Sequence, residues 1–213
     1  MQRRYFFMTS AVATLGAKAS ASSSKSANDT IRVAVLGVNG RGQSHIQGFS
    51  RLKNVEVAAL VDPDLAVARK VAGMVEGKTG RKAEIHQDLR RVLEDKEIDC
   101  ISVATPNHWH ALATIWGCQA GKDVYVEKPG SHNIFEGRKM IEAAEKYGRI
   151  VQHGVQLRSS VALREAVEKL RAGVIGKVYM SRAIIYRWRP SIGNFPQEEV
   201  PKDLNYDLWQ GPA

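Results

Sequence analysis

The 213-residue sequence is poor in the features that mark disulfide-bonded, metal-binding or membrane-spanning proteins. Its two cysteines, Cys100 and Cys118, fall in a predicted strand and a predicted helix, so we expect buried thiols rather than a disulfide or a metal site. None of the six histidines has a metal-ligand spacing such as H-E-x-x-H, and we predict no metal. The apolar run 6–17 is too short to span a bilayer stably.

The sequence also has no block of basic residues interleaved with aromatics, although its formal net charge is +9. Three of the positive charges, Arg3, Arg4 and Lys18, lie in a predicted leader. We therefore expect no nucleic-acid partner and a surface that favours phosphorylated or acidic ligands. The apolar content of 44% and the charged content of 25% are those of an ordinary globular protein.

The N-terminus has the pattern of an export signal. Arg3 and Arg4 precede the apolar run, and Ala19-Ser20-Ala21 fits an A-x-A cleavage site. We expect residues 1–29 to be a Tat-type signal peptide with a polar linker, and the mature protein to be periplasmic or secreted. The Tat route suits a protein that folds around a nucleotide before it crosses. The alternative is a frayed basic terminus.

From residue 30 onward, apolar strands alternate with stretches of helical apolar spacing. This alternation predicts βαβ units and a doubly wound parallel sheet, a Rossmann α/β domain over 30–155. Glycines stand where the helices are expected to end: Gly73, Gly77, Gly80, Gly121 and Gly148. The predicted strands are 31–37, 55–61, 83–86, 99–104, 123–127 and 150–155.

A glycine-rich turn follows the first strand, and an acid follows the second. In the G-x-G-x-x-G frame, Gly37 and Gly42 fill the first and third positions, and Asn39 stands at the second beside Gly40. Asn tolerates the positive φ that such a turn can need. The alternative is a tight turn without a ligand. We expect a nicotinamide dinucleotide here, bound by Asp62 and by the turn itself: Gly37, Val38, Asn39, Gly40, Arg41 and Gly42.

Further polar residues follow the later strands, at the edge where ligands of such sheets bind. Lys128, between Glu127 and Pro129, is placed to exchange a hydroxyl proton; the alternative is a surface lysine paired with Glu127. Asn107 is expected to cap the next helix. Pro106 is expected to pack on the nicotinamide, and His110 to face the cleft. His108 and Trp109 are interpreted as structural.

Four of these stretches together resemble the Gfo/Idh/MocA oxidoreductase family, which includes glucose-fructose oxidoreductase and inositol dehydrogenase. They are V-A-T-P-N-H-W-H (103–110), V-E-K-P (126–129), S-H-N-I-F-E-G-R-K-M (131–140) and Q-L-R-S (156–159). The resemblance covers nearly all of 30–213, and exported members are similar at the N-terminus too.

The resemblance implies a dinucleotide at the glycine turn and at Asp62, whose carboxylate favours NAD over NADP. It implies that Lys128 is catalytic, often before a cis proline bond. It assigns to the cofactor also Thr105, Pro106, Asn107, His110, Glu127, Lys128 and Gln156.

Beyond residue 156 we expect the beginning of an incomplete α/β C-terminal domain that binds substrate and forms dimers. A helix is predicted around Leu163 to Leu170, and a strand over 177–187. The family's second catalytic histidine has no counterpart, because no histidine follows His153. We therefore expect a truncated chain, and homo-oligomers only for a full-length one.

The leading functional hypothesis is an NAD(P)-dependent oxidoreductase that moves a hydride between nicotinamide and a carbinol carbon of a sugar, inositol or related polyol. Lys128, Arg158 and Trp188 are the candidate substrate contacts; for Trp188, a core or interface position is an equal alternative. Two other hypotheses stay open. One is a glycoside hydrolase that uses NAD for transient oxidation and elimination, and the other is a non-catalytic nucleotide-binding fragment.

Overall fold

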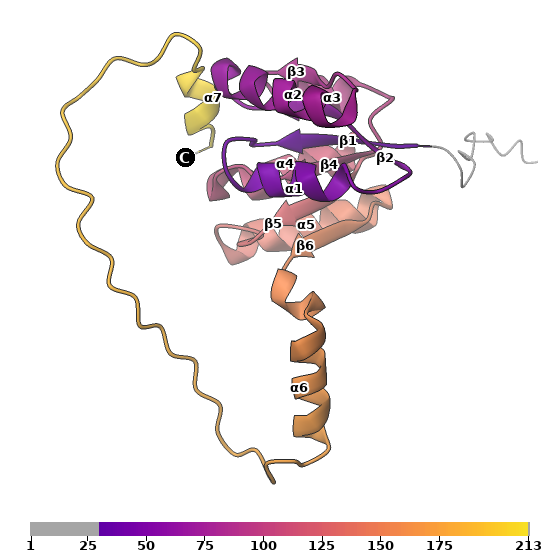
Figure 1. The fold of residues 1–213 in the computed structure, drawn as a ribbon, viewed down its shortest axis with the longest axis vertical. Helices are drawn as coiled ribbons and strands as arrows, with labels where there is room; N and C mark the ends of the chain where they lie inside the picture. Colours follow the sequence, from indigo (N-terminus) through magenta and orange to yellow (C-terminus); the bar gives the residue numbers. More distant parts are fainter. Residues whose placement is uncertain (1–29, 213) are drawn as a thin grey trace, which may run out of the picture.

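The computed structural model describes residues 30–212 and contains one sheet of six parallel strands in the order β3-β2-β1-β4-β5-β6 (Figure 1). The sequence prediction of these strands and of a doubly wound parallel sheet is confirmed, and each strand lies within about one residue of its predicted bounds. The strands are β1 (Ile31–Leu36), β2 (Val55–Val61), β3 (Glu84–His86), β4 (Cys100–Val103), β5 (Asp123–Glu127) and β6 (Val151–Gly154).

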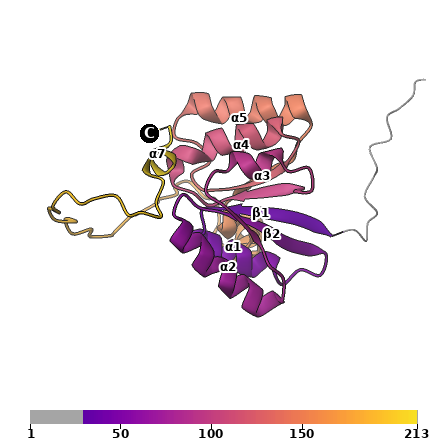
Figure 2. The ribbon, with the colours of Figure 1, turned by 90° about the horizontal axis from the view of Figure 1, so that it is seen from above.

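Helices cover both faces of the sheet, with α1 and α2 on one side and α3, α4 and α5 on the other (Figure 2). The chain builds outward from β1 through β2 to β3, then returns to place β4 on the other side of β1. The strand order therefore reverses between β1 and β4, which is where ligands bind in open sheets of this kind. The helices are α1 (Arg41–Phe49), α2 (Leu65–Thr79), α3 (Arg90–Glu94), α4 (His110–Gln119), α5 (Ile134–Tyr147), α6 (Val161–Arg171) and α7 (Tyr206–Gln210), with 3-10 turns η1 (Asn107–Trp109) and η2 (Gln156–Ser159).

The alternation of side chains along β1 divides the core into two layers. Val33 and Val35 pack under α1 and α2, whereas Ala34 and Leu36 pack under α4 and α5. All four are at most 1% exposed, because a central parallel strand is covered on both faces. Both cysteines are free thiols: Cys118 is buried, and burial, followed by Asp99 and Asp123, raises the pKa of the partly buried Cys100 to about 11.

Three of the five predicted helix-ending glycines are confirmed. Gly80 and Gly148 cap α2 and α5 in the left-handed conformation, and Gly121 follows α4 with φ of +76°. Gly73 and Gly77 were wrongly predicted to end a helix and lie inside α2. The apolar positions of α2 continue past them to Val75, and burial of that face outweighs the low helix propensity of glycine.

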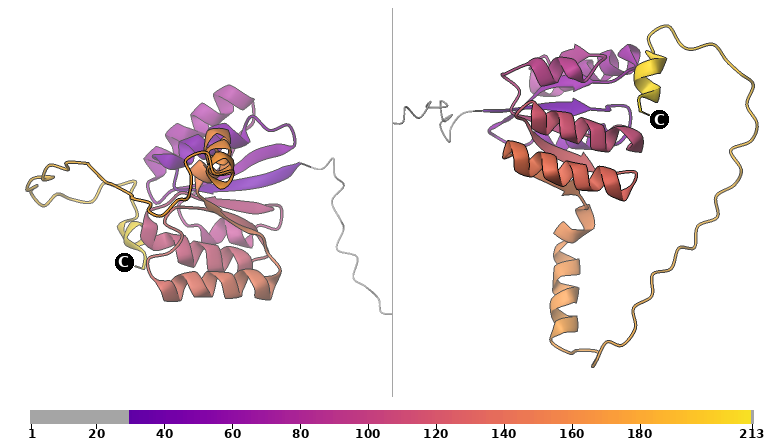
Figure 3. Two further views of the ribbon diagram at one scale, coloured as in Figure 1. Left: turned by 90° about the horizontal axis from the view of Figure 1, so that it is seen from below. Right: turned by 180° about the vertical axis from the view of Figure 1, so that it is seen from behind.

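The predicted helix after residue 160 is confirmed as α6, but the predicted strand over 177–187 is wrong. The chain there is extended and exposed, and it runs away from the sheet before returning at α7 (Figure 3). A strand needs a neighbour to pair its backbone groups, and no described segment lies alongside this one. Among residues 30–212, no helix is both long and apolar enough to cross a membrane.

Two glycines of α2 give a matched test of these assignments. A Cβ at either Gly73 or Gly80 would have no atom within 4 Å, but only Gly80 has a positive φ, of +68°. Gly73→Ala is expected to stabilise the protein by up to about 1 kcal/mol, and Gly80→Ala to destabilise it by about 1–2 kcal/mol. Urea unfolding curves measure both. Equal shifts of the same sign would contradict the assigned end of α2.

Candidate functional site

The glycine turn after β1 is closely packed on one side and open on the other. Gly37 has φ of +79°, and a Cβ there would lie 2.7 Å from the carbonyl oxygen of Ala104. A Cβ at Gly42 would lie 2.0 Å from the carbonyl oxygen of Gly37, whereas one at Gly40 would meet nothing within 4 Å. Asn39 does not adopt a positive φ, so the turn forms without using that tolerance. The first and third glycines are thus needed for packing, and the Gly40 side is free for a ligand.

The N-terminus of α1 begins at this open side without a side-chain cap. Gly40 is the N-cap residue, and the first turn of the helix contains no acidic residue. Uncapped amides at a helix N-terminus bind phosphate through the N–H groups and the helix dipole. The first amides of α1 are therefore able to hold a phosphate group of a ligand.

Asp62, at the end of β2, holds the turn in place. One carboxylate oxygen accepts a hydrogen bond from the Val38 amide at 2.9 Å, and the other from the Asp64 amide at 3.1 Å. Burial raises the pKa of Asp62, and the backbone hydrogen bonds only partly offset that effect. Asp62 also lines the cavity beside the turn, and a carboxylate keeps further acceptor capacity after two hydrogen bonds.

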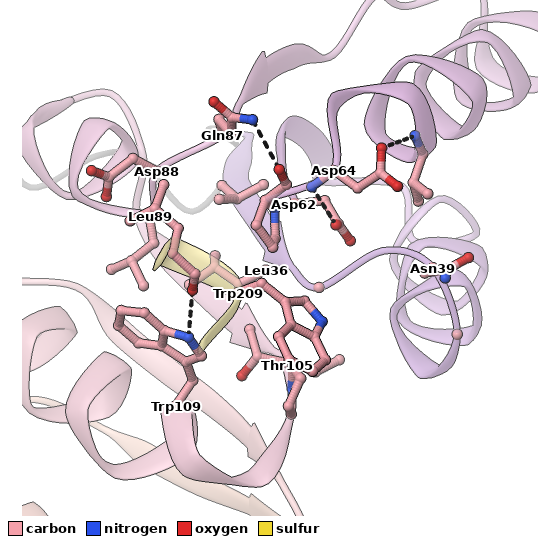
Figure 4. Close-up of a pocket in the computed structure, with 18 of the residues that line it drawn as sticks. Leu36, Asn39, Asp62, Asp64, Gln87, Asp88, Leu89, Thr105, Trp109 and Trp209 are labelled. Carbon is pink, nitrogen blue, oxygen red and sulfur yellow. Dashed lines mark hydrogen bonds between the residues drawn. The ribbon is translucent and has the colours of Figure 1, made fainter. Parts of the chain in front are cut away.

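A cavity of about 380 Å³ lies at the carboxyl ends of β1 to β4 (Figure 4). This volume is within the range of small-molecule sites. The hydroxyl of Thr105 is buried there without a hydrogen-bond partner, which is unusual for a native polar group. Seven predicted residues line the cavity: Gly37, Asn39, Gly40, Arg41, Asp62, Thr105 and Pro106.

Glu127 joins the turn to the end of β5. Its side chain is buried, and Oε1 accepts hydrogen bonds from Arg41 Nε at 2.9 Å, His45 Nε2 at 3.0 Å and Gln156 Nε2 at 2.5 Å. Burial favours a higher pKa for Glu127, but the hydrogen bonds from Arg41 and His45 outweigh it, and the pKa lies below its usual value. The carboxylate is therefore charged and links α1, β5 and η2.

His45 completes this connection. Because a carboxylate only accepts, Nε2 donates to Glu127, and Nδ1 accepts from the Ser102 hydroxyl at 2.8 Å. Burial, opposed by Glu127, lowers the pKa of His45, so the ring is neutral at neutral pH. Sequence reasoning missed this residue, and the one available signal was its position one turn into the helix after the glycines.

Lys128 lies at the same edge of the sheet as the glycine turn, directly after β5. Its side chain is exposed, its amide donates to Glu127 Oε2 at 3.3 Å, and the peptide bond to Pro129 is cis. The turn and the lysine are thus joined through one residue, Glu127. Lys128 itself does not line the cavity, which extends from the turn toward β3.

Four predicted residues take other positions. The side chain of Val38 is in the core, and only its amide faces the turn. His110 does not face the cleft: it is 1% exposed, with Nδ1 2.6 Å from the Pro129 carbonyl oxygen and Nε2 2.9 Å from that of Thr105. Asn107 does not cap α4, because a 3-10 turn begins there and intervenes. Trp188 is 90% exposed on the extended segment and is not among the residues that line the cavity.

Arg158 lies in η2 and lines a second, shallower hollow with Tyr125, His153 and Gln156. Gln156, in the same turn, donates to Glu127, the residue directly before Lys128. Residues 30–212 contain no group of three His, Cys, Asp or Glu side chains that could hold a metal ion.

The cavity also contains residues that sequence reasoning missed. Gln87 and Asp88 follow β3 at the same edge, so their position was available from the strand prediction. Trp109, interpreted as structural, lines the cavity and donates from Nε1 to the Leu208 carbonyl oxygen at 2.9 Å. Leu204, Leu208 and Trp209 come from the far end of the chain, and no local pattern connects them to the turn.

Comparison with known proteins agrees with this geometry. The family model of Gfo/Idh/MocA, described as an oxidoreductase family with an NAD-binding Rossmann fold, matches residues 31–155. The chain belongs to this family. The resemblance stated from the four motifs is thereby confirmed, as is the Rossmann fold.

Individual relatives differ in activity. Inositol 2-dehydrogenase/D-chiro-inositol 3-dehydrogenase of Shouchella clausii is 28% identical over 73% of this chain and 44% of its own length. Alpha-N-acetylgalactosaminidase of Shewanella oneidensis is 34% identical over 55% of this chain and 27% of its own. The chain therefore spans less than half the length of these curated relatives.

Among solved structures, myo-inositol 2-dehydrogenase from Lactobacillus plantarum has a TM-score of 0.63 at 22% identity, covering 70% of this chain and 43% of its own, and shares the fold. GenD2 from gentamicin A biosynthesis, solved in complex with NAD, has a TM-score of 0.54 at 27% identity. The match covers 59% of this chain and 34% of GenD2.

The pH dependence of stability follows from His45 and Glu127. In the unfolded chain His45 has a pKa near 6.5, whereas in the folded protein burial lowers the pKa of this side chain. The unfolded state therefore binds the proton first, and stability should fall as the pH drops below about 6.5. The lowered pKa of Glu127 adds stability that is present above about pH 4.5 and is lost as the pH falls further.

We expect His45→Gln to flatten the fall in melting temperature between pH 7.5 and 5.5, as measured by circular dichroism. His132→Gln, which changes an exposed histidine, should keep the wild-type slope. Parallel curves for wild type and His45→Gln would show that His45 does not carry the effect.

Proposed function

We propose that the protein is an NAD-dependent oxidoreductase that transfers a hydride between nicotinamide and a carbinol carbon of a sugar, inositol or related polyol. The observation that carries the proposal is that two groups are connected at one edge of the sheet. The first is the uncapped N-terminus of α1, beside the glycine turn, and the second is Lys128. Hydrogen bonds from Arg41 and His45 of α1 to Glu127, the residue before Lys128, connect them.

The residues present fit a dinucleotide. The α1 amides and the open side at Gly40 would hold the pyrophosphate, Asp62 the ribose hydroxyls, and the unpartnered hydroxyl of Thr105 a polar group of the cofactor. Asp62 and Asp64 line the cavity and would repel a 2′-phosphate, so NAD is proposed ahead of NADP. When bound, NAD supplies the hydride acceptor or donor.

Lys128 is proposed to move the proton. A hydroxyl that loses hydride from its carbon must also lose its proton, and the unprotonated amine of a lysine at the nicotinamide end can accept it. Glu127 and His110 act as positioning residues: Glu127 holds the start of the loop, and His110 contacts the carbonyl oxygen of Pro129. Arg158, in the neighbouring hollow, is proposed to contact the substrate.

The substrate class comes from the relatives, several of which are named inositol dehydrogenases. The test is nicotinamide reduction by the purified full-length protein with a panel of inositols, sugars and polyols. Lys128→Ala is expected to lower kcat by about 100-fold or more while NAD affinity, measured by calorimetry, changes little. Lys139→Ala, on the exposed surface of α5, is the matched control. Wild-type turnover by Lys128→Ala would remove its assigned role.

A second candidate is an NAD-dependent glycoside hydrolase, favoured by the relative named alpha-N-acetylgalactosaminidase at 34% identity. Hydrolysis by transient oxidation and elimination would use the same cofactor and lysine. Release of free sugar without accumulation of reduced nicotinamide would identify it.

We further propose three divisions of the chain: a leader over 1–29, a dinucleotide-binding domain over 30–155, and from 156 the beginning of a substrate and dimerisation domain. The family match over 31–155 supports the second. The predicted leader lies outside the described residues.

Export by the Tat route is testable in cells. Replacing Arg3 and Arg4 together by lysine keeps the charge but removes the twin arginine, and should leave the protein in the cytoplasmic fraction. The unchanged protein is expected in the periplasm or the medium, shorter at its N-terminus. The control is the double variant Arg51→Lys and Lys53→Arg, in the loop after α1, which also leaves the charge unchanged. Cytoplasmic wild-type protein would contradict the export proposal.

A further inference from the structure

The segment 203–211 is held against the cavity although it lies far from the glycine turn in sequence. The Leu65 amide donates to the Asp203 carbonyl oxygen at 3.0 Å, and the Asn205 amide to that of Pro63 at 2.9 Å. Asp64 and Leu204 form an antiparallel bridge between these two bonds. The segment is thus paired to the backbone that directly follows Asp62.

Side chains from three other places hold the same segment. Gln87 Nε2, after β3, donates to the Asp203 carbonyl oxygen at 3.1 Å, and Trp109, before α4, donates to that of Leu208. Arg69 of α2 pairs with the Asp203 carboxylate at 2.9 Å. The segment therefore bridges the carboxyl ends of β2, β3 and β4 and forms one wall of the cavity.

The part of the cavity wall that this segment forms is apolar. Leu204, Leu208 and Trp209 line the cavity together with Leu89 and Val67. Trp209 stacks on Tyr206 with ring centroids 5.7 Å apart and an interplanar angle of 19°, which fixes the orientation of its ring. Trp209 is 45% exposed and is available to a ligand.

The groups that line this one cavity suit one half of a dinucleotide. The glycine turn before α1, Asp62 and this apolar wall all line it, and a flat heterocycle attached to a ribose at Asp62 would lie against the apolar wall. We propose that the segment 203–211 is the outer wall of the adenosine subsite, with Trp209 in contact with the adenine base. This inference rests on the proposed function, because it names further binding residues of the same site.

The alternative role for this segment is a purely structural clasp over the strand ends. The two roles differ in one respect: a clasp affects folding and all ligands alike, whereas an adenine contact affects only ligands that contain adenosine. ADP-ribose carries the adenosine half without nicotinamide and is therefore the probe, together with NAD itself.

The experiment measures NAD and ADP-ribose binding to the full-length protein by calorimetry. Trp209→Ala is expected to weaken both ligands about tenfold, as found when aromatic residues that stack on bases are removed, and Trp209→Phe to retain most of the affinity. Tyr179→Ala, an aromatic 89% exposed on the extended segment, should leave both affinities unchanged. Melting curves establish that each variant is folded.

Each result decides between the claims. Wild-type affinity for both ligands in folded Trp209→Ala would overturn the adenine contact while leaving the proposed function intact. Loss of NAD affinity with undiminished ADP-ribose affinity would also overturn it, because the effect would lie in the nicotinamide half. A wild-type protein that binds neither ligand would overturn the proposed function and this inference with it.

Discussion

The arrangement of the site depends on the buried carboxylate of Glu127. A charged group out of water needs several donors, and Glu127 has three side-chain donors on Oε1 and a backbone amide on Oε2. Two of these donors, Arg41 and His45, come from α1, so the N-terminus of this helix is fixed relative to the end of β5, directly before Lys128. The separation between the proposed phosphate-binding amides and the proposed proton-transfer lysine is thereby set by the fold.

Asp62 plays the corresponding part on the other side of β1. Its hydrogen bond from the Val38 amide and the close contacts at Gly37 and Gly42 hold the glycine turn against the ends of the strands. Both carboxylates are thus bound by protein donors behind the turn, and the first amides of α1 stay open in front. A phosphate bound there would lie near two negative groups, and Arg41, half exposed at the turn, supplies compensating positive charge.

The sequence was sufficient for the sheet and for the sheet edge at which the cavity lies. Buried parallel strands have near-continuous apolar runs, and the carboxyl ends of such strands meet at one edge, which places Asp62, Thr105 and Lys128 together. It was insufficient for side-chain direction. Whether His110 faces the cleft or the loop carbonyls depends on the 3-10 turn η1, which shifts the start of α4 and has no periodic signal of its own. The apolar run at 177–187 had strand composition, but composition cannot supply a pairing partner.

The contribution of Trp209 could not be predicted because it depends on where a long excursion ends. Residues 172–202 leave the domain after α6, beyond the edge strand β6, and the chain docks again beside β2 and β3. To do so, the chain crosses roughly 20 Å of sheet at the carboxyl edge, which far fewer extended residues would span. The excess chain carries Ile185, Tyr186 and Trp188, each at least 90% exposed. The excursion starts at the end of α6, which is exposed along its length and points away from the sheet, so only its far end, where 203–211 pairs beside Asp62, is held at the cavity (Figure 1).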